Sequence, residues 1–279
     1  MKIHKLGLFV NIQKTDGMGY IQKVQEACME QGIQLFMLCG ADGVPALSSM
    51  PPLDALLVLG GDGTILYAAH IMGHPVCPIL SMNLGTLGFL TEFASDGIVD
   101  AIKRLAEGNY YVQRRILLSG RFETEKEGYT ALNDIAVTRG SSPHVIEVNV
   151  FVDGEFAYRF AGDGALVASP TGSTAYSLSA GGPLVAPGLE CFIVAPICPH
   201  TLSSRPMVVS SASTIRMEFS PRDHTSGMIL SVDGIQGPKV NEKKALVLSK
   251  SEKQLSFIRF SEKDNFFERL HCKLSEWRV

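Results

Sequence analysis

The chain has 279 residues, of which 46% are hydrophobic and 19% charged, and its formal net charge is −3 at pH 7. This length and apolar content suffice for a buried core and favour two domains. The charge provides no basic field for nucleic acid or an anionic membrane, so neither is expected as a partner. The N-terminal residues lack the pattern of a signal peptide, and no run approaches the about 18 apolar residues of a membrane span, which favours a cytoplasmic protein.

The cysteine pattern agrees with a reducing compartment. Six cysteines are present, and none forms a CxxC pair: Cys28, Cys39, Cys77, Cys191, Cys198 and Cys272. They fall mostly in apolar segments, so we expect reduced core residues rather than disulfides or metal ligands.

Strand and helix patterns alternate in the first third of the chain. Strands are predicted at residues 5–11, 33–38, 53–59 and 75–82. Helices are predicted at 19–31, from residue 65 onward and at 95–107, and a loop at 41–52. This alternation is typical of a parallel sheet covered by helices, so the sequence predicts an N-terminal Rossmann-like α/β domain.

Short alternating segments dominate after Tyr110 and predict an antiparallel β-sandwich. The predicted strands are 115–122, 131–138, 145–152, 156–160, 165–169, 191–196, 214–219, 228–232, 245–248 and 255–260. A helical insertion is expected at 173–180 and a closing helix at 264–277. The predicted domains are therefore an α/β domain, 1–97, joined by the C-terminal helix, 262–279, and a β domain, 98–261.

Three glycines surround one carboxylate after the third predicted strand. Residues 60–64 read Gly-Gly-Asp-Gly-Thr, and helical spacing resumes at Ile65. Glycine lets backbone amides approach an anion, and a helix that starts there adds free N–H groups and the positive end of its dipole. The loop suits phosphate, although a tight strand-to-helix turn also needs glycine. Asp62 would repel phosphate unless it holds a metal or takes a proton, so we interpret it as a residue that takes part in the chemistry of the site.

Two more segments are rich in glycine and hydroxyl groups. Residues 83–90, NLGTLGFL, follow the fourth predicted strand at the kind of strand end where open parallel sheets bind ligands. An ordinary glycine loop is the alternative. Residues 162–183 could place many short hydrogen bonds around a sugar or base. A Ser/Thr-rich linker is the alternative, but linkers seldom carry an apolar strand such as 165–168.

Two polar segments are less specific. Asn133-Asp134 begins a predicted strand, where a turn is the ordinary expectation. In residues 199–206, PHTLSSRP, His200 and Arg205 could either contact phosphate or hold the loop. The chain lacks the P-loop, GxGxxG, the protein-kinase HRD and DFG motifs, GxSxG and HExxH.

In this order and over almost the whole chain, these segments resemble the bacterial NAD kinase family. Residues 60–64 resemble its GGDGT signature, 85–90 its second glycine loop, and 133–134 its Asn-acidic pair. Residues 169–183 resemble its long Thr/Ser/Gly signature nearly letter for letter, and 199–206 its PHTLSxRP segment. The resemblance implies ATP-dependent phosphorylation of the adenosine 2′-hydroxyl of NAD to give NADP. It also implies Mg²⁺ or another divalent metal with ATP, a homotetramer, and polyphosphate as a possible donor.

The resemblance also assigns residues to roles. Asp62 would accept the proton of the 2′-hydroxyl, and Asn133 and Asp134 would hold the adenosine portion. Our mechanistic hypothesis adds that Asp134 holds the neighbouring ribose hydroxyl and that the donor phosphates meet the amides of Gly60, Gly61 and Gly63, with Thr64 close by. The remaining residues expected at the NAD site are Phe89, His144, Ala161, Asp163, Thr174, Ala175, Tyr176, Ser177, Ser179 and Gln236. The chain departs from the family pattern at two positions: Ala161 stands where some relatives have Arg, and Cys198 precedes the Pro-His pair where other residues are common. No residue is assigned as a metal ligand.

The sequence is less consistent with three other functions. A lipid kinase of the diacylglycerol or sphingosine type shares the glycine signature but would need an apolar entry, which the hydroxyl-rich residues 169–179 do not favour. A 6-phosphofructokinase would carry more basic residues for a sugar phosphate. A non-catalytic nucleotide-sensing module would have little use for a carboxylate among phosphate-binding glycines.

Overall fold

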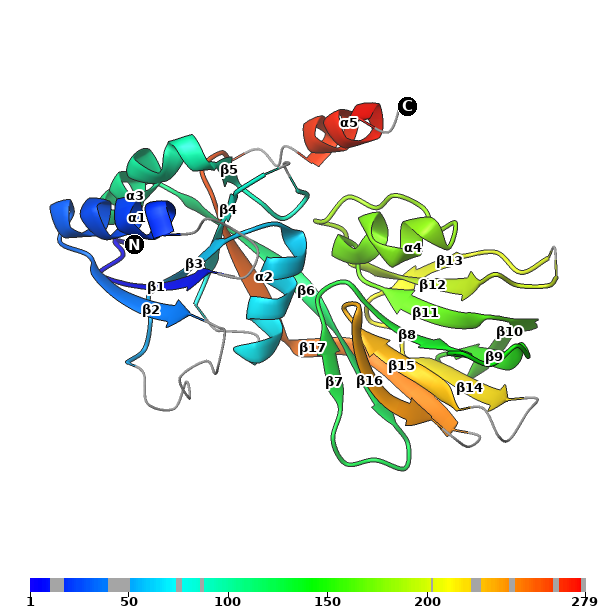
Figure 1. The fold of residues 1–279 in the computed structure, drawn as a ribbon. Coiled ribbons are helices and arrows are strands. Elements are labelled where there is room, and N and C mark those ends of the chain that lie inside the picture. The colour runs from blue at the N-terminus through cyan, green and yellow to red at the C-terminus, as the bar shows by residue number, and fades with distance from the viewer. Residues whose placement is uncertain are drawn as a thin grey trace. The chain divides into compact units, whose positions relative to one another are not determined.

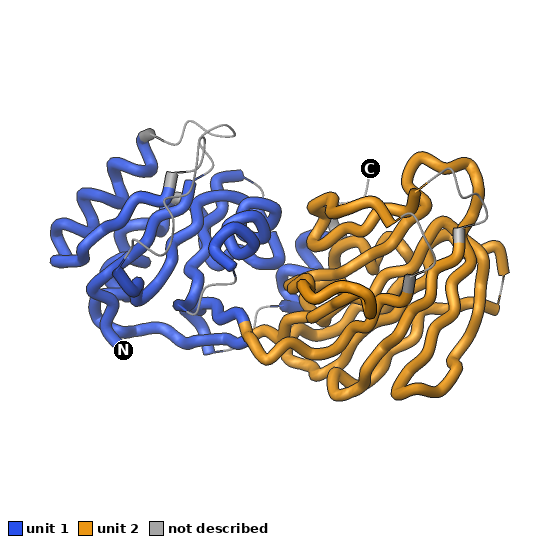
Figure 2. Tube along the Cα trace, turned by 90° about the horizontal axis from the view of Figure 1, so that it is seen from below, with its two compact units in different colours: residues 1–114, 255–279 blue, residues 115–254 orange. Residues whose placement is uncertain are grey.

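The computed structural model of the chain describes residues 1–10, 18–39, 51–73, 77–85, 88–201, 203–221, 227–240, 244–262 and 266–276. The chain divides into two compact units, coloured separately in Figure 2. Unit 1 comprises Met1–Arg114 and Leu255–Val279, and unit 2 comprises Arg115–Gln254. Two long strands, β6 (Tyr111–Phe122) and β17 (Lys244–Arg259), contribute residues to both units.

Unit 1 is built on a parallel sheet, as the strand–helix alternation predicted (Figure 1). Its strand order is β4-β3-β1-β2, with β5 beside β4 and Phe257 of β17 paired with Ile79. The strands are β1 (Lys5–Val10), β2 (Gln34–Cys39), β3 (Ala55–Leu59), β4 (Ile79–Asn83) and β5 (Phe93–Ala94). Every residue of β3 and β4 is buried, so the sheet is covered on both faces.

Helices supply that cover. Helices α1 (Met18–Glu30) and α3 (Ile98–Glu107) pack against each other and share one apolar cluster with the sheet. Helix α2 (Asp62–Ile71) buries its Ile65 face against β3. The predicted helix 95–107 is divided into a 3₁₀ turn, Ser95–Gly97, and α3, which ends where Gly108 adopts a φ of 75°. The closing helix is α5 (Phe266–Glu276), and residues 264, 265 and 277 of the predicted range lie outside the described residues.

Unit 2 is an antiparallel β-sandwich, which confirms the predicted fold class. One sheet has the order β13-β12-β11-β8-β15-β16; the other carries β10, β9, β14 and the first part of β17, with β6 and β7 attached. A single core cluster draws Val137 and Val167 from the first sheet and Val148 and Met217 from the second. The strands, besides β6 and β17, are β7 (Tyr129–Ala131), β8 (Asp134–Thr138), β9 (Ile146–Val152), β10 (Glu155–Gly162), β11 (Gly164–Ala168), β12 (Cys191–Ile197), β13 (Met207–Ser210), β14 (Ile215–Pro221), β15 (Met228–Val232) and β16 (Ile235–Val240).

The strand predictions fail where local signals mislead. β16 was not predicted because it contains glycine and proline, but it lies at a sheet edge, where proline is tolerated. The predicted strands 245–248 and 255–260 are one strand, β17. It pairs with β14 near its start and with β4 near its end, so the polar residues between these two regions stay in the strand. The predicted strand 131–138 breaks at Leu132 and Asn133, and the insertion 173–180 is a 3₁₀ turn, Thr171–Thr174, followed by α4 (Tyr176–Ser179).

The described cysteines are free thiols, as expected: Cys28, Cys77, Cys191, Cys198 and Cys272. Cys198 and Cys272 are exposed, so the expectation of core positions is wrong for these two. Among the described helices, none has the length and apolar character needed to cross a membrane.

Candidate functional site

The first glycine loop lies between β3 and α2 of unit 1. Gly60 has a φ of 150°, and a Cβ there would lie 2.5 Å from Thr64 Oγ1. Both features require glycine, so the fold accounts for this residue. Thr64 is buried, and its N–H donates to Gly61 O at 2.9 Å, which closes the first turn of the helix.

Gly61 and Gly63 have a different status. A Cβ at either position would meet no described atom within 4 Å, so protein packing does not explain these two glycines. Gly61 is the N-cap of α2, and it has no side chain to cap the first N–H groups. The helix start therefore presents exposed backbone and the positive end of a dipole, which together suit an anion.

Asp62, the first residue of α2, holds the second glycine loop. Phe89 N–H donates to Asp62 Oδ2 at 2.9 Å, and Leu90 N–H donates to Oδ1 at 3.1 Å. A Cβ on Gly88 would lie only 2.0 Å from Oδ1, so glycine is required for this approach. The two sequence-predicted loops are thus joined through the one carboxylate that we singled out.

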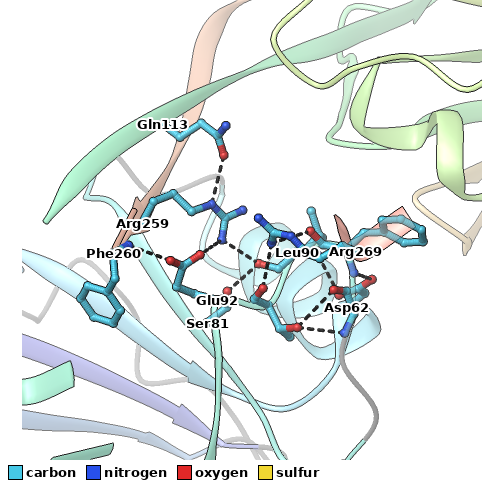
Figure 3. Close-up of polar contacts among 11 residues, drawn as sticks. Asp62, Ser81, Leu90, Glu92, Gln113, Arg259, Phe260 and Arg269 are labelled. Atoms are coloured by element: carbon cyan, nitrogen blue, oxygen red, sulfur yellow. Dashed lines mark hydrogen bonds and ion pairs between the residues drawn. The ribbon is translucent and has the colours of Figure 1, made fainter. Parts of the chain in front are cut away.

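Further contacts fix the second loop from the opposite side (Figure 3). Leu90 O accepts from Ser81 Oγ at 2.7 Å and from Arg259 Nη1 at 3.2 Å. Arg269 Nη1, on α5, donates to Phe89 O at 3.2 Å and to Thr91 O at 2.9 Å. Residues 86 and 87 of the predicted loop lie outside the described residues.

The Asn133-Asp134 pair of unit 2 is held by a carboxylate from the turn between β15 and β16. Asp233 accepts the N–H groups of three successive residues, Leu132 at 2.9 Å, Asn133 at 2.6 Å and Asp134 at 3.1 Å. Its own N–H donates to Asp134 O at 2.9 Å. The chain at Asp233 has a φ of 50° and continues into Gly234 at 77°, a turn that aims the carboxylate back at the pair.

The hydroxyl-rich segment packs directly on the same pair. Ser169 N–H donates to Asn133 O at 2.8 Å, and a Cβ on Gly172 would lie 2.2 Å from that oxygen. Ser177 Oγ is buried and has no hydrogen-bond partner among the described residues. Gly182 packs so closely that a Cβ would lie 2.3 Å from Ser177 Oγ. The segment is therefore part of a folded polar cluster and not a linker.

Asp134 is the most perturbed acid of this cluster. Its side chain is 3% exposed, and no hydrogen bond to its carboxyl group is found within the described part of the chain. Burial, reinforced by the nearby charge of Asp233, raises the pKa of Asp134 to about 7. Burial is also the main cause that raises the pKa of Tyr176, with smaller contributions from the charges of Cys198, Asp134 and Asp163. Asp134 therefore titrates near neutral pH.

The other predicted residues of unit 2 differ in exposure. Asp163 pairs with Arg139 at 2.6 Å, and Arg139 also donates to Ser142 O, beside the exposed His144. Gln236 is exposed on β16. Ala161, Thr174 and Ala175 are half-buried, and Tyr176 and Ser179 are exposed. Gln236 lies on β16, three residues after Asp233, and its place at the NAD site stays a prediction.

Sequence reasoning missed three charged residues that organise these loops: Asp233, Arg259 and Arg269. The Asp233-Gly234 dipeptide is a turn signal, but nothing local shows that its carboxylate reaches residues 99–101 positions away. Arg269 follows Phe266 at helical spacing, and both side chains are buried. The buried face of α5 therefore contains a cation beside an aromatic ring.

Together, the glycine loop on a parallel sheet and the polar cluster of the β-sandwich define a two-unit nucleotide-binding protein. Residues 50–110 match the sequence model of the ATP-NAD kinase N-terminal domain, and residues 132–260 that of the ATP-NAD kinase C-terminal domain. An NAD kinase of Caldanaerobacter subterraneus subsp. tengcongensis is 35% identical over 98% of this chain and 99% of the relative. The chain belongs to the NAD kinase family.

Other relatives and solved structures agree. An NAD kinase of Clostridium botulinum strain Loch Maree is 37% identical over 97% of this chain and 96% of its own. The fold is similar to yeast NADH kinase complexed with NADH, at a TM-score of 0.87 and 25% identity over 100% of this chain and 89% of that one. It is also similar to an NAD kinase from Archaeoglobus fulgidus in complex with ATP, at a TM-score of 0.76 and 29% identity over 97% and 98% of the two chains.

Proposed function

We propose that this protein transfers the γ-phosphoryl group of ATP to the 2′-hydroxyl of the adenosine ribose of NAD, giving NADP. One observation carries the proposal beyond family membership. A carboxylate stands at the start of α2 between two glycines, Gly61 and Gly63, that protein packing does not require. Open backbone suits the donor phosphates, and the carboxylate supplies a proton acceptor next to them.

Unit 1 would perform the chemistry. The amides of Gly60, Gly61 and Gly63, with Thr64, would meet the donor phosphates. Asp62 would accept the 2′-hydroxyl proton as the oxygen attacks the γ-phosphorus and the bond to the ADP oxygen breaks. Its two oxygens each take one loop N–H, which leaves further lone pairs for the substrate hydroxyl. Because phosphoryl transfer passes through a loose transition state, positioning and charge neutralisation would account for most of the rate.

Unit 2 would bind the adenosine part of NAD. The backbone of Asn133 and Asp134 is fixed by Asp233 and by the Ser169–Gly172 turn, so the start of β8 is held in place before substrate arrives. Asp134 would hold the hydroxyl next to the reacting one and so select the 2′ position. The other residues proposed for the NAD site are Phe89, His144, Ala161, Asp163, Thr174, Ala175, Tyr176, Ser177, Ser179 and Gln236.

The metal would be Mg²⁺ or another divalent ion that arrives with ATP. Among the described residues, no group of three or more His, Cys, Asp or Glu side chains is placed to hold an ion. Mg²⁺ is commonly held by substrate phosphates, water and one or two carboxylates, and the first glycine loop contains one carboxylate, Asp62. These residues fit an ion carried by the nucleotide, which would offset phosphate charge. We further propose a cytoplasmic homotetramer, and polyphosphate as an alternative donor.

A coupled assay tests the proposal. The purified protein is incubated with ATP, Mg²⁺ and NAD, and NADP is measured with an NADP-specific dehydrogenase. We expect NADP in proportion to enzyme, and none when ATP is omitted. Parallel reactions replace NAD with NADH, diacylglycerol or fructose 6-phosphate, or replace ATP with polyphosphate. Phosphorylation of the lipid or sugar without NADP, or nucleotide binding without any transfer, would contradict the proposal.

A further inference from the structure

The peptide group between Phe89 and Leu90 is held by opposite charges at its two ends. Its N–H, on Leu90, donates to Asp62 Oδ1 at 3.1 Å. Its carbonyl, on Phe89, accepts from Arg269 Nη1 at 3.2 Å (Figure 3). In a planar trans peptide the C=O and N–H point in opposite directions, so the arginine and the aspartate lie on opposite sides of one rigid group.

Arg269 is built into this position. It is 7% exposed, and the same Nη1 atom also donates to Thr91 O at 2.9 Å. One turn earlier on α5, the buried Phe266 packs against Phe89, with ring centroids 6.4 Å apart. The helix therefore contacts the loop through one apolar and one charged side chain on the same face.

The loop in turn sets the orientation of Asp62. Phe89 and Leu90 give one N–H to each carboxylate oxygen, which defines the plane of the carboxylate as well as its position. A guanidinium on the Phe89 carbonyl polarises the peptide and strengthens the N–H bond on its other side. A charged group 207 residues after Asp62 in the sequence thus acts on it through one peptide group.

We propose that Arg269 is a positioning residue for Asp62, holding the Phe89–Leu90 peptide so that the carboxylate is fixed for proton acceptance. This inference rests on the proposed role of Asp62. The alternative is that Arg269 only attaches α5 to unit 1, and this reading predicts a loss of stability without a specific loss of turnover.

The experiment compares Arg269→Ala with Arg104→Ala as the matched control. Arg104 also anchors the C-terminal segment, because its Nη2 donates to Phe260 O at 2.7 Å and its guanidinium lies 4.3 Å from the Phe260 ring. None of its described contacts reaches residues 88–92. We expect Arg269→Ala to lower kcat about 10- to 100-fold with the KM values for NAD and ATP retained, the usual effect of a misplaced reacting group. Arg104→Ala should lower Tm and keep kcat.

Chemical rescue separates positioning from stability. Guanidinium ion at a concentration below that which unfolds the protein should restore part of the kcat of Arg269→Ala and leave Arg104→Ala unchanged. Arg269→Lys, which keeps the charge but reaches fewer carbonyls, should fall between wild type and Arg269→Ala, and it serves as the test if the alanine variant does not fold.

The outcomes are distinct. If the wild type makes no NADP, the proposed function fails and this inference with it. If the wild type makes NADP and Arg269→Ala lowers Tm but keeps kcat, as Arg104→Ala should, the inference alone is overturned. If the alanine variant does not fold, full kcat in Arg269→Lys overturns it.

Discussion

Each of the two units places one carboxylate at the first residue of a regular element, Asp62 of α2 and Asp134 of β8, and the two are treated in opposite ways. In unit 1, Asp62 receives two backbone N–H groups and lies half-buried at a helix start. In unit 2, Asp134 is 3% exposed, and among the described contacts its carboxyl group receives no hydrogen bond. Asp62 is thus fixed in orientation, whereas burial and a neighbouring acid control the protonation of Asp134.

The supports of the two acids differ in the same sense. Cations hold the loop around Asp62, through Arg259 and Arg269 on backbone carbonyls. An anion, Asp233, holds the strand start at Asp134, through three backbone N–H groups. Burial and the neighbouring charge of Asp233 disfavour the ionised form of Asp134. Unit 1 therefore orients its carboxylate with backbone donors, whereas unit 2 controls the protonation of its own.

The largest expected effect is that of Asp62→Asn. The amide cannot accept the 2′-hydroxyl proton, so kcat should fall about 10²- to 10⁴-fold while NAD binding is retained. Steady-state kinetics and calorimetric NAD titration measure the two quantities. Asp100→Asn is the matched control, because Asp100 is also a first-turn acid of a helix in unit 1. Near-normal turnover of Asp62→Asn would remove Asp62 from the role of base and leave it as a clamp for residues 88–90.

Asp233→Asn tests the support in unit 2. Asparagine tolerates the positive φ at this position, but it replaces a carboxylate that accepts three N–H groups, so we expect stability to fall by about 1–3 kcal/mol. Because Asn133 and Asp134 lose their anchor, the KM for NAD should rise about tenfold, and the KM for ATP should hold.

Asp153→Asn is the control for that variant. Asp153 occupies a similar Asp-Gly turn, with a φ of 51°, but it is exposed and accepts one described N–H, from Thr214 at 2.8 Å. Thermal unfolding and kinetics should show little change in this control. Equal changes in the two variants would mean that Asp233 acts only as a turn residue.

Gly61→Ala examines the open glycines of unit 1. A methyl group there meets no described atom, so the fold should tolerate it and Tm should remain within a few degrees. If donor phosphates approach this backbone, the KM for ATP should rise about fivefold, a loss of about 1 kcal/mol. Gly32→Ala is not a suitable control, because Gly32 has a φ of 67°; Gly19→Ala, open and in helix α1, is suitable. An unchanged KM for ATP would place the phosphates elsewhere.

Local sequence signals were enough to predict the elements and loops that are formed by contiguous residues. The strand β3, Gly60 and the start of α2 are contiguous, so composition alone revealed a turn with exposed amides. The edge strand β16 was missed because its glycine and proline contradict strand propensity and only its place in the sheet permits them. Propensity describes a residue's own backbone, and it carries no information about neighbours in the sheet.

The supports of the two acids were not predictable for a related reason. Arg269 reaches Phe89 across 180 positions, and Asp233 reaches Asn133 across 100. Each of these contacts depends on tertiary packing, and a lone arginine on an amphipathic helix ordinarily lies on the solvent side. Asp62 could be singled out from its own neighbours in sequence and Asp134 through the family resemblance, whereas the residues that fix their geometry or charge could be found only from the fold.

The smallest change is expected in the pH dependence of the KM for NAD, which tests directly whether Asp134 titrates. A ribose hydroxyl that donates to this carboxyl group favours its ionised form, so the KM for NAD should fall about threefold as the pH rises through about 7, the pKa of Asp134. Asp134→Asn should abolish the dependence, and Asp62→Asn should keep it in an equilibrium NAD titration, because Asp62 belongs to the other unit.

Stability provides an independent check with the opposite sign. The pKa of Asp134 is raised from its usual 3.8 to about 7, so the folded state binds this proton more tightly than the unfolded chain does. Its contribution to stability is therefore present below about pH 4 and is lost as the pH rises through about 7, by at most about 4 kcal/mol. Relative to Asp134→Asn, the wild type should lose Tm over this interval while its NAD affinity increases. A wild type whose Tm and NAD affinity both follow the asparagine variant would mean that Asp134 is ionised throughout, and the two acids would then differ in exposure and hydrogen bonding but not in protonation.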